Sequence, residues 1–407
     1  MKNRHQVLYM AHLFILALLL LTVSHSAAAE ADKSEIRLGM STVLSGPAAE
    51  LGREMQRGVL AGLEQANRNG GFSGRKLRLI SYDDGYEPSR TAPNMHRLLD
   101  QDRVLAVIGN VGTPTAIASL PLIRAHQTLF FAPFSGAGGL RRIPPDRYVI
   151  NVRASYAEEI AAMVDGLAAQ TDLRPEEIAF FTQRDGYGDA GYVGGFAALK
   201  RHGLQNEAQV LHVRYRRNTL AVENALADLL LAEPAPRAVI MVGAYAPCAK
   251  FIRLARQAGL DSLLLNVSFV GSAALAHDLG AEGDGVVITQ VVPHPQDNSL
   301  PLVRDYLDAL ETYDQKPPSF VSLEGYLAFR TLRAGMNKAP GELDRENLIE
   351  GLERLGDFDL GLGTPLQLNA AQHQASHHVW PTELVKGQVV PTSWQEISRR
   401  LPPRRSP

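Results

Sequence analysis

Short apolar runs alternate with longer amphipathic stretches along the first part of the chain, beginning near residue 35. The runs expected to form strands cover 36–40, 77–82 and 104–108. The stretches expected to form helices lie between them, at 52–69 and 91–100. This β-α-β-α-β order predicts a parallel sheet with helices on both of its faces.

The helix predicted at 52–69 shows the periodicity on which these assignments depend. Apolar positions recur there at three- and four-residue steps, at Leu51, Met55, Val59, Leu63 and Ala66. That spacing places them in one buried stripe along the helix. The helix is expected to stop at Asn69, because the two glycines that follow suit a left-handed backbone.

A second, similar half begins after strands predicted at 128–132 and 147–152. Its helices are expected at 157–170, 191–202, 220–232 and 247–258. Its strands are expected at 178–182, 208–215, 238–242, 263–267 and 285–291. The predicted fold class is therefore α/β, with two Rossmann-like lobes built on parallel central sheets.

The helices that follow the second sheet are expected at 302–313, 320–337 and 345–355. They must pack back on a lobe that is already built, so the chain crosses between lobes more than once and forms a hinge. The lobe boundaries we predict are 30–151 plus about 292–356 for the N-terminal lobe, and 152–291 plus about 357–395 for the C-terminal lobe. Residues 396–407 are rich in Pro and Arg and are expected to be disordered.

The first 29 residues have the pattern of a cleaved signal peptide for export to the periplasm. A basic start at Lys2 and Arg4 precedes an apolar run at 14–23, and small residues at 27–29 follow it. The alternative is a membrane anchor, but the apolar run is too short to span a bilayer. A lipid anchor needs a cysteine just after that run, and the one cysteine of the chain is Cys248. We therefore expect a periplasmic protein without a direct membrane anchor, and a monomer.

Charge and cysteine content exclude several classes of protein. The formal net charge of −2 argues against a large basic face, so nucleic acid is not an expected partner. A single cysteine excludes an intrachain disulfide, and stability must come from burial of the core. We interpret Cys248 as a small buried apolar residue, because a nucleophile would need a nearby histidine that the sequence does not place.

Candidate binding chemistry lies in the loops after the strands, because ligands bind at the carboxyl ends of strands in open parallel sheets. Four such loops mix glycine with polar or hydroxyl residues, at 44–47, 109–115, 133–139 and 183–189. Helix starts behind these loops offer backbone N–H groups, which suit an anion or a carboxylate. Each loop alone is also explained by ordinary capping, but recurrence in both halves favours a site. The first-half candidates are Thr113 and Ser135, with Tyr86 behind them.

Enzymatic alternatives have incomplete motifs. Residues 186–191 match a dinucleotide-binding glycine pattern, but the acidic residue it needs after the next strand is absent there. Ser135 is not part of a nucleophile elbow, which leaves an oxidoreductase or a hydrolase as the weakest alternative. His373, His377 and His378 have no matching carboxylate or cysteine set for zinc. We therefore expect no cofactor, no metal and no catalysis, and we assign Tyr187 to the wall of a cleft.

The ordered motifs resemble those of a known family: the branched-chain amino-acid (Leu/Ile/Val) binding family of type 1 periplasmic binding proteins, the solute-binding components of ABC importers. The motifs are Leu44-Ser45-Gly46-Pro47, Gly70-Gly71, Asp83-Asp84, the loop at 109–115, Gly136-Ala137 with Leu140-Arg141, Asp185-Gly186-Tyr187-Gly188, and Glu324-Gly325-Tyr326. The resemblance implies two lobes joined by a three-strand hinge, with the ligand held between them. It also implies that Thr113, with the loop of Ser135, Gly136 and Ala137, binds the ligand carboxylate. Tyr187 is then expected over the ligand, and Tyr245 in the wall of the cleft.

Two positions depart from the family pattern. Ser268 stands where amino-acid-binding relatives carry an acidic residue for the ligand ammonium, and Leu51 stands where they often carry an aromatic one. Burial of an ammonium without a counter-charge is costly, so the departure favours a carboxylate or another small polar ligand over a plain amino acid. The expected partners are this small-molecule ligand and an ABC permease in the inner membrane. The open alternative is a membrane sensor kinase or cyclase that reads the closed form.

Overall fold

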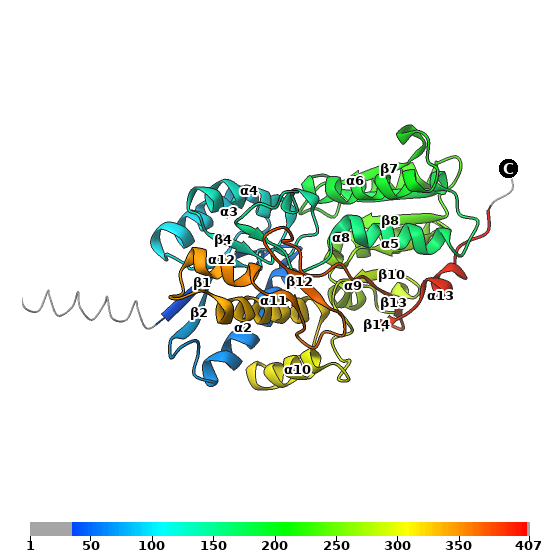
Figure 1. Cartoon of the computed structure of the whole chain (residues 1–407). Helices are drawn as coiled ribbons and strands as arrows, with labels where there is room; N and C mark the ends of the chain where they lie inside the picture. The colour runs from blue at the N-terminus through cyan, green and yellow to red at the C-terminus, as the bar shows by residue number, and fades with distance from the viewer. Residues whose placement is uncertain (1–34, 405–407) are drawn as a thin grey trace, which may run out of the picture.

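The computed structural model describes residues 35–404, which form two α/β lobes side by side (Figure 1). The first lobe contains a five-stranded sheet in the order β2-β1-β3-β4-β5. Its strands are β1 (Glu35–Thr42), β2 (Lys76–Asp83), β3 (Ala106–Ile108), β4 (Leu129–Phe131) and β5 (Val149–Ile150). All of the pairs in this sheet are parallel, as the alternating pattern predicts.

Helices from two distant parts of the sequence cover the first sheet (Figure 1). They are α2 (Ala49–Arg68), α3 (Pro88–His96), α4 (Thr113–Ala125), α10 (Pro301–Tyr313), α11 (Phe320–Lys338) and α12 (Arg345–Glu353). A π-helical turn at Arg97–Gln101 continues α3, where one uninterrupted helix is expected from the sequence. Helix α11 packs on α2 so closely that a Cβ at Gly58 would overlap the backbone carbonyl of Ser322. This contact explains why the buried stripe of α2 contains a glycine.

The second lobe contains a seven-stranded sheet in the order β14-β13-β10-β9-β8-β6-β7. Its parallel strands are β6 (Ile178–Gln183), β7 (His212–Tyr215), β8 (Ala238–Val242), β9 (Leu263–Asn266) and β10 (Val287–Gln290). Its helices are α5 (Tyr156–Ala168), α6 (Gly186–Arg201), α7 (Glu223–Leu230), α8 (Tyr245–Gln257), α9 (Ser272–Leu279) and α13 (Trp394–Ser398). The strand expected at 208–215 is shorter, because Asn206 caps a 3-10 turn at Glu207–Gln209.

An antiparallel hairpin extends the second sheet at one edge, where only parallel strands are expected from the sequence. Strands β13 (Trp380–Val385) and β14 (Gln388–Pro391) pair with each other, and β13 pairs with β10. The turn between them has positive φ at both Lys386 and Gly387. Two consecutive residues of this kind give a tight two-residue turn whose twist matches the flanking strands.

Three segments of chain cross between the lobes. The first crossing follows β5, and the second follows β10. The third runs beside the first, because Asn151 N–H donates to the His373 carbonyl at 2.7 Å and Ala375 N–H donates to the Asn151 carbonyl at 2.9 Å. A two-stranded sheet of β11 (Gly356–Phe358) and β12 (Leu366–Leu368) precedes this crossing, which therefore lies later than the boundary expected near 357.

The last described residues are packed on the second lobe, which corrects the expectation of disorder for 396–404. Ile397 of α13 is buried, and the Arg237 guanidinium donates to the Pro402 carbonyl at 2.7 Å. Arg404 donates to Glu177, a carboxylate that is itself only 2% exposed. Composition alone predicts a solvated tail here, whereas these buried polar groups of the lobe require the tail as a partner.

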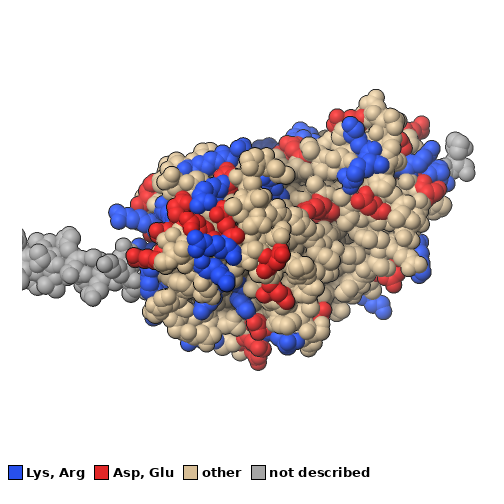
Figure 2. Space-filling view, viewed as in Figure 1, with Lys and Arg blue, Asp and Glu red and all other residues tan. Residues whose placement is uncertain are grey.

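The described residues show two further features of the surface. No helix within 35–404 has both the length and the apolar composition needed to cross a bilayer. On the face drawn in Figure 2, basic and acidic side chains are interspersed over both lobes. That distribution agrees with the near-neutral net charge and shows no single-sign patch on this face.

Candidate functional site

Two hydroxyl groups meet at the carboxyl edge of the first sheet. Thr113 is the first residue of α4, after β3, and Ser135 lies in the loop after β4. Both side chains are fully buried, and their hydroxyl oxygens are 2.7 Å apart. The adjacent parallel strands β3 and β4 bring these loops together, as the sequence predicts. The positive end of α4 lies at the same place, so the local field favours an anion.

Arg141 makes hydrogen bonds to the loop at 135–137. Arg141 donates from Nη1 to the carbonyls of Ser135 and Ala137, at 3.1 Å each. Gly136, between them, packs directly against the Tyr156 ring, where a Cβ would overlap the ring. Arg141 therefore fixes the orientation of this loop, and Gly136 allows the close approach of Tyr156.

Aromatic rings from both lobes gather around these loops. Phe269 of the second lobe has ring-centroid distances of 4.5 Å to Tyr187, 5.2 Å to Phe134 and 6.2 Å to Tyr86. Tyr156 lies 5.1 Å from Tyr187. All five side chains are buried. We call Tyr86, Phe134, Tyr156, Tyr187 and Phe269 the ring cluster.

Hydrogen bonds hold Tyr86 and Tyr187, two of the three tyrosines predicted from the sequence. The Tyr86 hydroxyl accepts from Gln183 Nε2 at 3.1 Å, which joins the first lobe to the second. Tyr86 has φ 63°, and the Asp84 carboxylate accepts its N–H at 2.9 Å and so holds this left-handed turn. The Tyr187 hydroxyl donates to the Gly243 carbonyl at 3.3 Å. Burial raises the pKa of both tyrosines well above the ordinary value, so both hydroxyls stay protonated.

A polar clasp joins the two lobes beside the ring cluster. Arg217 Nη2 donates to Glu87 at 2.7 Å, and Arg217 Nη1 donates to Asp185 of its own lobe at 3.0 Å. Asn218 Nδ2 donates to Glu87 at 2.6 Å and to the Gly85 carbonyl at 3.1 Å. These contacts connect the loop after β7 with the loop after β2. We call Arg217, Asn218 and Glu87 the interlobe clasp.

Ser268 belongs to a buried ionic network and does not line an open cleft. Glu159 of α5 accepts from the Ser268 backbone N–H at 2.7 Å and from its hydroxyl at 3.0 Å. Arg153, which follows β5, donates to Ser268 Oγ and to Glu159, the latter at 3.2 Å. Burial opposes the charge of Arg153, but the Glu324 and Glu159 carboxyls outweigh it and raise its pKa. A carboxylate is thus present beside Ser268, supplied by a helix more than 100 residues earlier.

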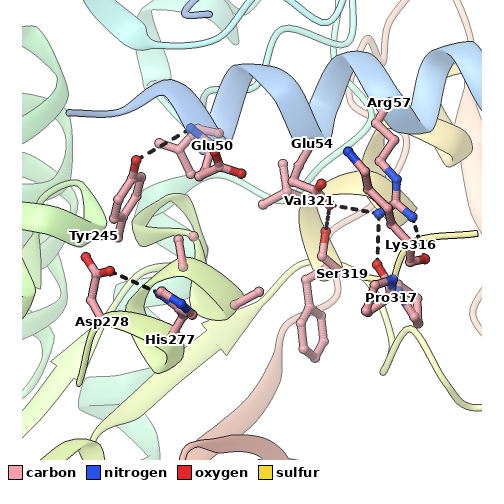
Figure 3. A pocket seen from close by; sticks show the side chains of 16 residues that line it. Glu50, Glu54, Arg57, Tyr245, His277, Asp278, Lys316, Pro317, Ser319 and Val321 are labelled. Carbon is pink, nitrogen blue, oxygen red and sulfur yellow. Dashed lines mark hydrogen bonds and ion pairs between the residues drawn. The ribbon is translucent and has the colours of Figure 1, made fainter. Parts of the chain in front are cut away.

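A cavity of about 530 Å³ lies at the lobe boundary (Figure 3). Its first-lobe wall comes from the start of α2 and the segment at 316–321, and its second-lobe wall comes from Tyr245 and the start of α9. The Tyr245 hydroxyl accepts from the Glu50 N–H at 3.5 Å across this boundary. Leu51 packs against Gly271, two residues beyond Phe269, which places the cavity beside the second lobe's contribution to the ring cluster. Its volume suits a small molecule.

The structure groups the eight predicted residues into three places. Six of them border the ring cluster or belong to it: Thr113, Ser135, Gly136, Ala137, Tyr86 and Tyr187. Ser268 belongs to the ionic network beside it. Tyr245 lines the cavity instead. Their roles toward a ligand stay a prediction.

Sequence reasoning missed the residues that complete this region. Arg153 is a lone cation at the end of an apolar strand, which is a usable signal. Glu159 cannot be told apart from Glu158 in the sequence, because both are acidic residues in the first turn of a helix, where such residues are common. Phe269 and Tyr156 have no signal that separates them from core residues.

The other motifs have structural explanations. A Cβ at Gly188 would overlap the Gln183 carbonyl, and one at Gly191 would overlap Val242, so these glycines of the dinucleotide-like pattern allow α6 to pack on its sheet. His377 contacts Glu158, whereas His373 contacts Glu353 and two backbone carbonyls. Among residues 35–404, no group of His, Cys, Asp and Glu is arranged to hold a metal.

Comparison with known families decides what this two-lobed architecture is. Residues 35–388 match the family model described as periplasmic binding protein. The chain belongs to this family. The resemblance inferred from the ordered motifs is therefore confirmed.

Several proteins similar to this periplasmic binding protein are named as Leu/Ile/Val-binding proteins. The crystal structure of a possible leucine/isoleucine/valine-binding protein from Rhodopirellula baltica SH 1 is 52% identical, with a TM-score of 0.87 over 89% of this chain and 98% of that one. The leucine-, isoleucine-, valine-, threonine-, and alanine-binding protein of Pseudomonas aeruginosa is 25% identical over 84% of this chain and 86% of its own length. The Leu/Ile/Val-binding protein of Escherichia coli (strain K12) is 22% identical over 79% and 84%. These likenesses confirm the predicted fold class, and the named relatives are binding proteins rather than enzymes.

Proposed function

We propose that this periplasmic binding protein captures a small, carboxylate-bearing solute between its lobes and delivers it to an ABC permease in the inner membrane. The observation that carries the proposal is the buried hydroxyl pair of Thr113 and Ser135 at the start of α4, beside Gly136, on which the second-lobe Tyr156 ring packs. Amino acids and organic acids both carry the required group. The export signal that the proposal needs, at 1–29, lies outside the described residues.

The first lobe supplies the donors for the carboxylate. Thr113 and Ser135 can each turn a hydroxyl hydrogen toward an anion, and Arg141 holds the 135–137 loop in place for it. In the described structure the Thr113 and Ser135 hydroxyls are hydrogen-bonded to each other. A bound carboxylate would replace this one hydrogen bond with two, one from each hydroxyl. The start of α4 adds a favourable field without any reorganisation.

The second lobe closes over the bound solute. Phe269 of that lobe contacts the first-lobe ring of Phe134, and Tyr187 packs on Phe269. A ligand held between these rings and the first-lobe loops therefore interacts with both halves at once. A ligand that contacts both lobes binds the closed form more tightly than the open form and shifts the equilibrium toward closure. We place the mouth of the cleft at the cavity lined by Tyr245.

Calorimetry and thermal shift measurements test this proposal. The probes are L-leucine, L-isoleucine, L-valine and a panel of organic acids, because a ligand that binds only the folded state raises the melting temperature. Thr113→Ala and Ser135→Ala should each weaken binding of the best probe by about tenfold, since each removes one hydrogen bond. The matched control is Ser119→Ala, which deletes a buried hydroxyl of α4 that donates to the Thr115 carbonyl. Equal affinities for all four proteins would refute the assignment.

A further inference from the structure

A buried arginine borders the loop proposed to bind the carboxylate. Arg153 follows β5 on the first crossover, and its side chain is 1% exposed. Its guanidinium carbon lies 4.8 Å from the Phe134 ring centroid and 5.7 Å from that of Tyr156. The Tyr156 ring in turn packs on Gly136, and Tyr156 N–H donates to the Gly136 carbonyl at 2.8 Å. Arg153 and Tyr156 thus extend the same wall as the 135–137 loop.

Three buried polar atoms of these two residues have no hydrogen-bond partner within residues 35–404: Nε and Nη1 of Arg153 and Oη of Tyr156. Nη1 is 3.4 Å from the Glu324 carboxyl, so the two form an ion pair without a hydrogen bond. Burial raises the pKa of Tyr156, and Arg153, the Gly136 backbone and Thr113 oppose that rise. Within residues 35–404, none of these groups makes a hydrogen bond of good geometry to the phenol. Buried polar groups are nearly always paired, and a guanidinium can only donate, while a phenol can donate as well. The missing partner is therefore an acceptor, and beside a fixed positive charge it is an anion.

The carboxylate next to Arg153 has no capacity left for a ligand. Glu159 accepts from Ser268 N–H, from Ser268 Oγ and, at 2.7 Å, from the Thr289 hydroxyl, and it pairs with Arg153. Each of its oxygens therefore has two partners. Glu324 is the other acid at this place, and burial raises its pKa to about 7 despite the nearby Arg153, so it is a weak counter-charge at neutral pH. A ligand ammonium finds no free, fully charged carboxylate here.

The surrounding side chains describe the rest of the ligand. Phe134, Tyr156, Tyr187 and Phe269 are buried rings that offer flat apolar surface beside the donors. Such rings favour a branched aliphatic or aromatic body. We propose that Arg153 and Tyr156 form a further anion-binding subsite, and that the solute is an organic acid with an apolar body and no amino group. This inference rests on the proposed function and narrows its ligand class.

Paired probes that differ only in the amino group test the ligand class. Isothermal titration of the purified chain compares isocaproate with L-leucine, and hydrocinnamate with L-phenylalanine. At least one acid should bind tenfold or more tightly than its amino-acid counterpart. An amino acid that binds as tightly as its acid, or more tightly, overturns this inference and leaves the proposed function standing. If none of these four compounds binds at millimolar concentration, the inference about the ligand class fails. The proposed function fails as well only if no carboxylate in the wider panel of organic acids and amino acids binds.

Two variants test the subsite with the acid that binds best. Tyr156→Phe keeps the ring on Gly136 and removes only the unpaired hydroxyl, and it should weaken binding about fivefold to tenfold. The control is Tyr306→Phe, which removes a buried first-lobe hydroxyl that is 2.6 Å from Ser322 Oγ, and it should leave the affinity unchanged. Arg153→Gln combined with Glu159→Gln avoids an uncompensated buried charge and should weaken binding thirtyfold or more. Glu159→Gln alone shows whether the ionic network tolerates loss of the Glu159 charge. An unchanged dissociation constant for Tyr156→Phe overturns the proposed subsite.

Discussion

The interlobe clasp gives this protein a means of favouring the closed form before any ligand binds. Arg217 and Asn218 of the second lobe together make three hydrogen bonds to Gly85 and Glu87 of the first. The Arg217 and Glu87 side chains are 22% and 38% exposed, so their ion pair contributes at most about 1 kcal/mol. The contacts of Asn218 add about 1 kcal/mol more. We expect the clasp to favour closure by about 2 kcal/mol, which is roughly a thirtyfold change in the closed-to-open ratio.

Removing the clasp should therefore open the unliganded protein. The variant is Arg217→Ala combined with Asn218→Gly, because residue 218 has φ 57° and glycine keeps that backbone conformation. Arg216→Ala removes the same charge from the exposed neighbouring side chain and is the matched control. Neither change touches the core of a lobe, so both variants should stay folded and keep a cooperative urea transition.

Single-molecule energy transfer measures the closed fraction directly. Dyes attach to cysteines introduced at Ile143, which is 97% exposed in the first lobe, and at Val193, which is 66% exposed in the second. The native Cys248 is buried, and burial raises its thiol pKa, so it does not compete for dye. The closed fraction should fall in the clasp variant and stay unchanged in the control. Identical distributions for the two proteins would show that the clasp contributes nothing to closure.

Two further predictions concern stability. Burial raises the pKa of Glu324 to about 7, with Arg153 and Arg141 lowering it and Glu159 raising it. Between about pH 4.5 and 7 the Glu324 carboxyl is protonated in the folded state but ionised in the unfolded state, so the folded state holds one more proton. The free energy of unfolding should therefore fall by up to about 3 kcal/mol as pH rises from 5 to 8. Glu324→Gln should lack this component in urea titrations at the two pH values, and equal slopes for both proteins would contradict it. Gly58→Ala should destabilise the first lobe by about 2 kcal/mol or more, because the added methyl overlaps the Ser322 carbonyl. Gly138→Ala, where a Cβ meets nothing within 4 Å, is its control in thermal denaturation, and similar melting temperatures would show that α2 and α11 can move apart.

The order of elements and one edge of the site follow from the local pattern of residues. The alternation of apolar runs and amphipathic stretches predicts two parallel sheets, because strand and helix periodicities differ and each element must bury one face. Loops at the carboxyl ends of neighbouring parallel strands must meet, so the same pattern predicts that Thr113 and Ser135 lie together, and their hydroxyls are in contact. That argument needs only local pattern and the geometry of a parallel sheet.

The second lobe's part of the site depends on contacts between residues that lie far apart in the sequence. Glu159 reaches Ser268 from 109 positions away, and Arg153 meets Glu324 of the first lobe across the hinge. The local sequence marks Arg153 as a lone cation after an apolar strand, but nothing around Glu159 distinguishes it from an ordinary helix-start acid. These residues interact because they are buried: a charge removed from water is costly unless it is paired, and the fold brings the partners together from distant parts of the sequence. The β13–β14 hairpin and the packed tail were missed for the same reason: long-range partners, and not local propensity, hold them in place.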